Sequence, residues 1–234
     1  MISNDCRIKL KEIFTDRYLE NEPLSRHINF RVGGPAAVFC IVKNINELTE
    51  ALSIIGDRCN HFILGGGTNV LASDRGFDGV VFKISLNSVD FQKTDMIAEA
   101  GVLSVVAARI AAEHGLSGLE WASTLPGTVG GMVRGNAGCF GGEAKDVIKY
   151  VRIIRAGKII KLNNKDLKFS YRHSLIKDTN DIVLEAVFAL QRGDKEEIKK
   201  KMAEIMVARK KSQPLKSGTA GCTFKNYEIR DNDD

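Results

Sequence analysis

The apolar and polar positions in the first part of the chain alternate between strand-like and helix-like patterns. A short, apolar and β-branched run over 37–43 predicts a strand. Asn44 and Glu47 then form a capping-box pattern at the start of a predicted helix. The apolar positions of that helix recur at helical spacing: Leu48, Ala51, Leu52 and Ile55. Strands predicted over 61–64 and 79–84 complete a strand–helix–strand order, which favours a sheet with at least one parallel pair.

The remainder of the chain is predicted to contain mainly strands, with helices at two places. Glycine is so dense from 127 to 142 that no regular helix is expected there. Asp194 and Glu197 are placed to cap a final helix. Its apolar stripe is Ile198, Met202, Ile205 and Met206. The other predicted elements are a strand over 97–101, a helix over 103–114, a hairpin of 151–155 and 158–162 about Ala156-Gly157, and a strand over 182–190.

The composition is that of an ordinary globular protein. The 234 residues are 44% hydrophobic and 27% charged, which excludes global disorder. The sequence has no apolar run long enough to span a membrane and no secretory signal at its start, so we expect a cytoplasmic protein. A net charge of +5 suits an anionic ligand but does not indicate nucleic-acid binding. Five widely spread cysteines without a C-x-x-C pair predict free thiols, with neither a disulfide framework nor a metal site.

Glycine is the unusual component, at 22 of the 234 residues, against an average usage of about 7%. Three consecutive glycines follow a predicted strand within LGGGTNVL (64–71). Because no Cβ blocks the approach, such a turn can present backbone N–H groups to a phosphate, with Thr68 and Asn69 adding side-chain hydrogen bonds. A tight turn without a ligand is the alternative. The spacing matches neither the P-loop nor the Rossmann fingerprint.

A second glycine-rich stretch, from 118 to 143, leaves much of its backbone bare. The apolar residues between its glycines can pack beneath them, so the surface suits a large flat cofactor lying against the main chain. Trp121 is interpreted as core or pocket wall rather than as a stacking platform. The glycines concerned are Gly127, Gly130, Gly131, Gly135 and Gly138.

These motifs together resemble the MurB family, the UDP-N-acetylenolpyruvoylglucosamine reductases of peptidoglycan synthesis. The resemblance implies an α+β fold of the FAD-binding PCMH type (vanillyl-alcohol-oxidase-like), with two subdomains and a substrate-binding domain. It also implies FAD, NADPH as the reductant and a UDP-sugar enolpyruvate as the substrate. We expect FAD to bind non-covalently, because the four histidines sit in no context that compels a covalent bond to flavin. The matching motifs are HINFRVGGPA (27–36), LGGGTNVL (64–71), LPGTVGGMVRGNAG (125–138), FSYRHS (169–174) and AGCTFKN (220–226).

The same resemblance implies which residues form the site. Arg172 matches the family's catalytic arginine, and Tyr171, Lys225 and Asn226 fall at substrate-binding positions. A fixed guanidinium suits that role, because hydride addition leaves enolate-like charge beside the substrate carboxylate. Without the resemblance, Arg172 would be interpreted as a surface residue. The positions implied to hold FAD are Gly65, Gly66, Gly67, Thr68, Asn69, Val70, Pro126, Gly127, Thr128, Gly130, Gly131, Asn136, Ala137, Gly138 and Arg209.

Cys222 stands where many members of the family have a proton-donating serine. A thiol is mostly protonated at neutral pH and is a stronger acid than a hydroxyl, so the exchange is chemically compatible with proton donation. A buried structural thiol is the alternative. We therefore predict that Arg172 and Cys222 are the catalytic residues.

The resemblance ends after Asn226. The family continues there with a stretch that completes the substrate-binding domain and holds a glutamate that assists protonation, and Glu228 does not match that glutamate. We therefore expect a chain truncated at its C-terminus. Two alternatives stay open: a non-catalytic FAD-binding remnant, and an FAD-dependent oxidase of the same fold.

The expected domain organisation follows from the elements and the motifs, and we expect a monomer. Residues 1–24 are charged and weakly patterned and are predicted to be a peripheral segment. The two FAD-binding subdomains are predicted to span 25–90 and 91–192, with FAD between them. Residues 193–234 are predicted to begin the substrate-binding domain.

Overall fold

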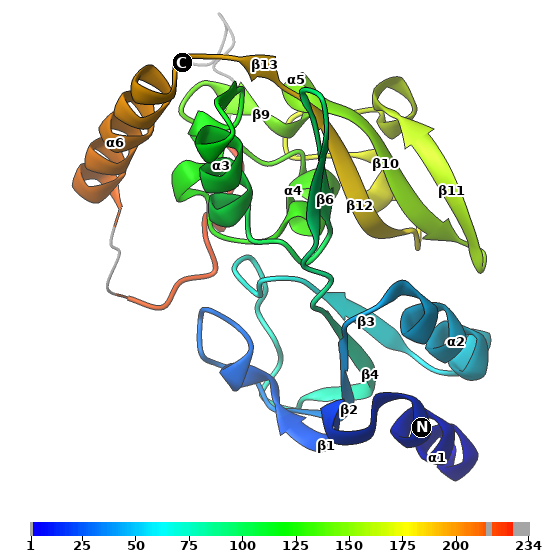
Figure 1. Ribbon diagram of the computed structural model, residues 1–234. Helices are drawn as coiled ribbons and strands as arrows, with labels where there is room; N and C mark the ends of the chain where they lie inside the picture. The colour runs from blue at the N-terminus through cyan, green and yellow to red at the C-terminus, as the bar shows by residue number, and fades with distance from the viewer. Residues whose placement is uncertain (1, 214–216, 227–234) are drawn as a thin grey trace, which may run out of the picture.

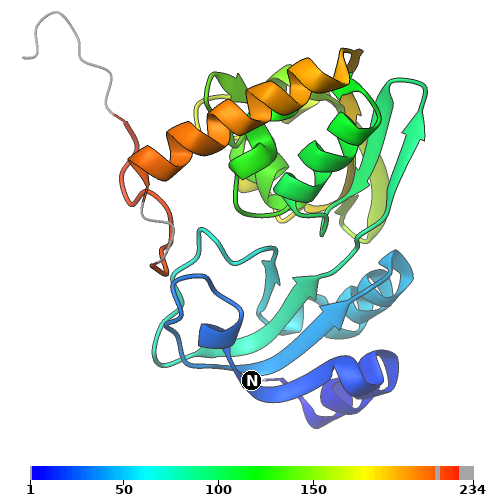
Figure 2. The same cartoon turned by 60° about the vertical axis from the view of Figure 1, so that its left-hand side comes forward.

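The computed structural model of the chain describes residues 2–213 and 217–226. Within these residues the chain folds into two lobes, one built on a four-stranded sheet and the other on a five-stranded sheet (Figure 1). The long helix α6 (Lys195–Ser212) runs along the second lobe, and residues 217–226 lie at the junction of the lobes (Figure 2). Two separate sheets confirm the predicted α+β fold.

The first sheet contains one antiparallel and two parallel strand pairs. The helices α1 (Asn4–Phe14) and α2 (Ile45–Ile55) pack on one face, where Phe82 is fully buried. The other face buries Phe39 beneath the loop 24–28. The strands, in spatial order, are β1 (Tyr18–Pro23), β2 (Pro35–Val42), β4 (Phe77–Ile84) and β3 (His61–Leu64).

The N-terminal residues are part of this lobe, so the prediction of a peripheral segment over 1–24 is wrong. Leu10 and Phe14 of α1 have no exposed surface, and β1 is an edge strand, with Tyr18 opposite Cys40. Two fully buried side chains one helical turn apart hold α1 against the core. Cys6 and Ile13 of the same helix are partly buried and pack against the core beside them.

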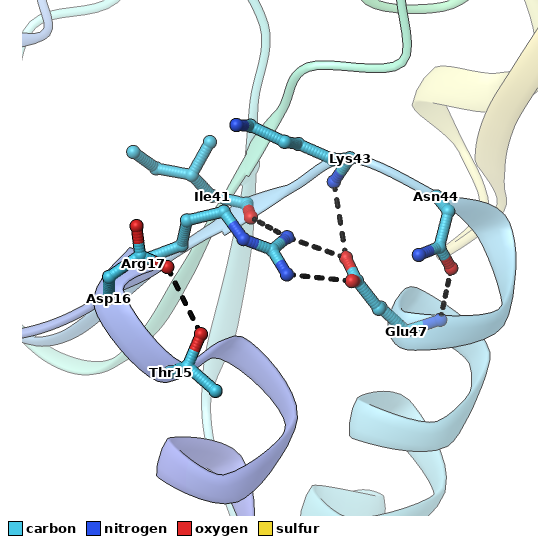
Figure 3. A network of polar contacts seen from close by, with 7 residues as sticks. All are labelled: Thr15, Asp16, Arg17, Ile41, Lys43, Asn44 and Glu47. Carbon is cyan, nitrogen blue, oxygen red and sulfur yellow. Dashed lines mark hydrogen bonds and ion pairs between the residues drawn. The ribbon is translucent and has the colours of Figure 1, made fainter.

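A polar network joins the end of α1 to the start of α2 (Figure 3). The side-chain oxygen of Asn44 accepts a hydrogen bond from the backbone N–H of Glu47 at 2.9 Å, as the capping pattern predicts. Both carboxylate oxygens of Glu47 accept hydrogen bonds from the guanidinium of Arg17 at 2.7 Å. The guanidinium also donates to the carbonyl of Ile41 at 3.0 Å. The hydrogen bonds from Arg17 hold the pKa of Glu47 below its usual value.

The second sheet is antiparallel throughout. Its hairpin turns at Ala156 and Gly157, whose φ angles of +47° and +73° are those of a tight two-residue turn, as predicted. The strands, in spatial order, are β11 (Lys158–Asn163), β10 (Ile148–Arg155), β12 (Ile182–Ala189), β6 (Asp95–Glu99) and β5 (Val89–Gln92).

The second glycine-rich stretch contains a helix, α4 (Val129–Gly135), so the prediction of no regular helix there is wrong. The helix packs against β12. Its glycines permit a close approach, because a Cβ added at Gly130 would lie 3.0 Å from the Cβ of Ala100. The N–H of Gly130 donates to the carbonyl of Ala100 at 2.9 Å. Close packing and this long-range hydrogen bond offset the weak helix propensity of glycine.

Short elements complete the second lobe and the connections. The longest of them is α3 (Ser104–Glu113), close to the predicted helix over 103–114. The others are η1 (Thr15–Arg17), η2 (Leu24–Arg26), η3 (Gly56–Arg58), β7 (Leu116–Ser117), η4 (Glu120–Thr124), β8 (Gly138–Cys139), β9 (Gly142–Glu143), α5 (Ala144–Val147), η5 (Asn164–Leu167), η6 (Leu175–Lys177) and β13 (Gln191–Arg192).

The helix α6 begins as predicted. The Asp194 side chain accepts hydrogen bonds from two backbone N–H groups of the first turn, at 2.9 and 3.0 Å. Ile198 and Ile205 are buried, whereas Met206 is 40% exposed, so the apolar stripe is narrower than predicted. Among the helices of the described residues, α6 included, we find none with the length and apolar character needed to cross a membrane.

Candidate functional site

The first glycine motif forms a loop directly after β3, at the edge that faces the second lobe (Figure 1). Gly67 has a φ of +66°, and its Cα lies so close to the carbonyl of His27 that a Cβ would collide with it. The carbonyl of Gly67 accepts a hydrogen bond from the N–H of Asn29 at 2.9 Å. Glycine is therefore required at this position by the backbone conformation and by the close approach of the loop 24–31.

The two glycine-rich segments meet at the junction of the lobes. A Cβ added at Gly66 would lie 3.0 Å from the Cα of Gly127, and one at Gly65 would lie 2.6 Å from the hydroxyl of Thr128. The hydroxyl of Thr68 donates to the carbonyl of Pro126 at 3.4 Å. The loop 65–70 and the segment 126–138, which are separate in the sequence, therefore form one backbone-rich surface.

One polar atom in this surface has no partner. The hydroxyl oxygen of Thr128 is buried and forms no hydrogen bond with any described residue. A buried hydroxyl without a partner is costly, and proteins usually satisfy such groups with protein, water or ligand. This hydroxyl and the glycines beside it fit a ligand that brings hydrogen-bonding atoms close to the main chain.

Asn136 follows α4 in a left-handed conformation, with a φ of +41°. Its amide nitrogen donates to Glu143 at 2.8 Å and to the carbonyl of Ser170 at 3.0 Å, and its oxygen accepts from the N–H of Lys145 at 3.0 Å. The side chain is fully buried and its hydrogen bonds go to the protein. We therefore interpret Asn136 as a residue that positions the neighbouring loops.

Tyr171 and Arg172 lie at the tip of a tight turn between Ser170 and His173, whose backbones exchange two hydrogen bonds of 3.1 Å. Arg172 has a φ of +55°, which is uncommon for a residue with a side chain. Its guanidinium donates to the carbonyl of Gly138 at 2.9 Å. The turn therefore fixes the guanidinium of Arg172 beside the end of the segment 126–138.

Four positively charged side chains gather around this turn, and we call them the cationic cluster: Arg134, Arg172, Lys177 and Lys225. Burial lowers the pKa of Lys177, and the positive charges of the other three lower it further. Repulsion within the cationic cluster would be relieved by an anion placed among these side chains.

The segment 217–226 crosses the junction of the lobes and carries Cys222. At one end the amide of Asn69 donates to the carbonyl of Ala220 at 2.6 Å. At the other, the N–H of Asn226 donates to the hydroxyl of Tyr171 at 3.2 Å. Cys222 lies between these two anchors and is exposed, so the alternative of a buried structural thiol is wrong.

The other predicted cofactor residues lie around the same junction. Arg209, near the end of α6, is half-buried. Its charge and that of Arg172 oppose the increase in the pKa of Cys139 that burial causes. Val70 packs with the apolar cluster beneath the first loop, and Gly138 is buried in β8, where a Cβ would lie 2.6 Å from the side chain of Glu143.

Sequence reasoning missed a hollow beside the loop 65–70. It has a volume of about 570 Å³ and is bordered by the loop 24–31 and by β4. The lining residues are Ser25, Arg26, His27, Ile28, Asn29, Arg31, Gly66, Thr68 and Lys83. The signal that could have revealed it is Lys83, the one basic residue in the otherwise largely apolar run FDGVVFKI.

Comparison with known proteins establishes the family. Residues 35–163 match an FAD binding domain family, and this range contains both glycine-rich segments. A UDP-N-acetylenolpyruvoylglucosamine reductase of Caldanaerobacter subterraneus subsp. tengcongensis is 44% identical over 221 residues, which cover 93% of this chain and 73% of that protein. This chain belongs to the MurB family. A reductase of the same name from Lachnoclostridium phytofermentans is 42% identical over 234 residues, covering 94% of this chain and 74% of that protein.

Solved structures agree with the membership in the MurB family. The MurB of Thermus caldophilus superposes with a TM-score of 0.78 at 33% identity, over 90% of this chain and 74% of that one. A vanillyl-alcohol-oxidase-type flavoprotein of Myceliophthora thermophila has a TM-score of 0.63 at 17% identity, over 82% of this chain and 48% of that one. The second likeness concerns the fold alone. It confirms the predicted fold type.

Proposed function

We propose that this chain is a flavin-dependent reductase that uses NADPH to convert UDP-N-acetylglucosamine enolpyruvate into UDP-N-acetylmuramate, for peptidoglycan synthesis in the cytoplasm. The observation that carries the proposal is the path of the segment 217–226. This segment is anchored at Asn69 and at Tyr171, and so it brings the thiol of Cys222 and the ammonium of Lys225 to the junction. There they join the guanidinium of Arg172, which a hydrogen bond to Gly138 fixes beside the second glycine-rich segment.

The residues that would hold FAD are those of the loop 65–70 and the segment 126–138. The unpartnered hydroxyl of Thr128 and the close approach of Gly65, Gly66 and Gly127 support this assignment. Bound there, FAD supplies hydride-transfer chemistry between NADPH and the substrate. The role of the chain is to bind both partners, to orient them and to stabilise the charge that develops.

The cationic cluster suits the proposed substrate, which carries a carboxylate and a diphosphate. Arg172 would pair with the substrate carboxylate and stabilise the enolate-like charge that reduction places beside it. Because a hydrogen bond to Gly138 already fixes the guanidinium, little reorganisation is needed when that charge appears. Lys177 and Lys225 would balance the remaining negative charge of the substrate.

The thiol of Cys222 would complete the reaction by donating the proton on its Sγ to the carbon beside the substrate carboxylate. Its exposure leaves the Sγ accessible to a substrate at the junction. The two anchors of the segment, Ala220 and Asn226, restrict where the thiol can lie. General acids act within hydrogen-bond distance of the accepting atom, so such restriction favours proton transfer.

The test begins with the flavin content of the purified protein. After acid denaturation, or after reconstitution with FAD, the visible spectrum should be that of flavin. NADPH oxidation should then require the enolpyruvyl sugar nucleotide and proceed equally under air and under nitrogen. Oxidation that requires oxygen would identify an oxidase, and a protein that binds flavin but oxidises nothing would be a remnant. Either result, or a protein that takes up no flavin, would overturn the proposal.

A matched pair of variants locates the reaction. Arg172→Met should lower substrate-dependent NADPH oxidation by roughly 10²- to 10³-fold, the usual loss when a donor to a developing anion is removed. Arg109→Met changes an exposed arginine of α3 that pairs with Glu113, and it should leave the rate unchanged. Equal rates for the two variants would contradict the role of Arg172.

A further inference from the structure

Lys83 is the basic residue of the central strand β4 and does not fit the apolar pattern around it. Its neighbours in the strand, Phe82 and Ile84, are buried, and its cross-strand partners are Ile41 and Leu64. The side chain is half-buried and its ammonium donates a hydrogen bond to the carbonyl of Gly65, the first residue of the glycine loop. Burial lowers the pKa of Lys83.

Lys83 has no acidic partner among the described residues. Arg17, by contrast, is a cation with a side chain only 17% exposed, and it pairs with Glu47 at 2.7 Å. Within the described ranges, the polar partner of Lys83 is a neutral carbonyl. A half-buried charge without a counter-charge destabilises the fold unless a ligand provides one.

The surroundings of Lys83 suit an anion. The hollow of about 570 Å³ that Lys83 borders is also lined by Arg26, Arg31, Gly66 and Thr68. None of the described residues that line it is acidic. Gly66 has no side chain to restrict access to its backbone, and Thr68 adds a hydroxyl. Three basic side chains, a glycine loop and a hydroxyl are the groups that bind phosphates.

We propose that Lys83 binds the diphosphate of FAD. The positive charge of Lys83 would balance the negative charge of the diphosphate beside the loop 65–70. This inference rests on the proposed function, because it presupposes that the chain binds FAD. In the free protein the ammonium is held by the carbonyl of Gly65, which keeps it at the hollow. The contribution of Lys83 is specific to the phosphates, and so riboflavin, which has none, is bound without it.

The experiment compares Lys83→Gln and Lys83→Arg with the wild type in the full chain. Gln keeps a donor for the carbonyl of Gly65 but removes the charge, whereas Arg keeps the charge. Lys149→Gln is the control, because Lys149 is exposed and pairs with Asp95 on the second sheet. Dissociation constants for FAD and for riboflavin are measured by flavin fluorescence, at several salt concentrations, on protein with a matched circular dichroism spectrum.

We expect Lys83→Gln to weaken FAD binding by roughly 10- to 100-fold, the loss typical of a charge-assisted hydrogen bond. Lys83→Arg should stay within a few-fold of the wild type, riboflavin binding should be unchanged, and the salt dependence of FAD binding should become less steep in Lys83→Gln. Equal FAD affinity in the wild type and Lys83→Gln would overturn the inference, and so would an equal loss for FAD and riboflavin. A wild-type chain that binds no flavin would instead overturn the proposed function.

If Lys83→Gln does not fold, the comparison of Lys83→Arg with the wild type decides. A large loss of FAD affinity in Lys83→Arg then overturns the inference.

Discussion

The ion pair between Arg17 and Glu47 allows a quantitative prediction about the N-terminal lobe. The perturbation is Arg17→Met, which keeps the aliphatic stem but removes both hydrogen bonds of 2.7 Å to Glu47. The variant leaves the Glu47 carboxylate with backbone partners alone, among them the N–H of Lys43 at 3.3 Å. Lys9→Met is the matched control, because Lys9 pairs with Asp5 in an exposed part of α1.

The magnitude follows from the exposure of the two side chains. Breaking a fully buried pair costs about 3–5 kcal/mol of unfolding free energy, and a surface pair contributes about 0–1 kcal/mol. The side chains of Arg17 and Glu47 are each 17% exposed. The cost of breaking this pair should therefore lie nearer the value for a buried pair than the value for a surface pair. We expect Arg17→Met to cost about 2–3 kcal/mol. Lys9→Met, whose pair is 51% and 73% exposed, should cost less than about 0.5 kcal/mol.

The assay is urea unfolding at pH 7 and at successively lower pH. The pKa of Glu47 is lower in the folded protein, so its contribution to stability is complete above its unfolded pKa of about 4.3. That contribution is lost as the pH falls through the folded pKa. A second variant, Glu47→Gln, removes this titrating group. The unfolding free energies of the wild type and Glu47→Gln should differ most near neutral pH, and that difference should shrink below about pH 4. A cost for Arg17→Met no larger than that for Lys9→Met, or a difference independent of pH, would refute the reasoning.

The remaining predictions concern packing and chemistry. Gly130→Val should lower the unfolding free energy by about 1–3 kcal/mol, because the new Cβ would press on Ala100. Gly135 has open space around it, so Gly135→Ala should raise the unfolding free energy by up to about 1 kcal/mol. Thermal melts check both variants. Thr128→Val should leave the flavin-free protein as stable as the wild type, yet weaken FAD binding measured by fluorescence. Cys222→Ala should spare flavin reduction by NADPH but slow the substrate-dependent reoxidation by roughly 10²- to 10⁴-fold in stopped-flow absorbance, with Cys222→Ser recovering most of the rate.

Elements whose signal is local could be predicted from the sequence. The helix α2 has a cap at Asn44, apolar positions at helical spacing and a glycine at Gly56, and it forms over Ile45–Ile55. The turn at Ala156 and Gly157 is defined by its own two residues. Such elements need no information from distant parts of the chain, because caps and turns are satisfied by neighbouring atoms.

Elements that depend on distant partners could not be predicted. The helix α4 is rich in glycine, and what stabilises it is its packing on Ala100, which precedes it by a whole helix and loop. Lys83 presents the same difficulty, because a single lysine in a strand carries no pattern until the loop at Gly65 and the hollow beside it are known. In both cases the physical reason is a contact between segments that the sequence alone does not place together.

The same dependence on distant contacts explains how the candidate site is divided. The FAD-binding match covers 35–163, whereas Tyr171 and Cys222 lie beyond it. Two side chains connect the FAD-binding range to the residues beyond it. Asn69 belongs to the glycine loop, and its amide donates a hydrogen bond to the segment that carries Cys222. Tyr171 adjoins Arg172, whose guanidinium reaches back to Gly138 at the end of the second glycine-rich segment. The residues proposed to handle the substrate are thus positioned by the residues proposed to hold the cofactor.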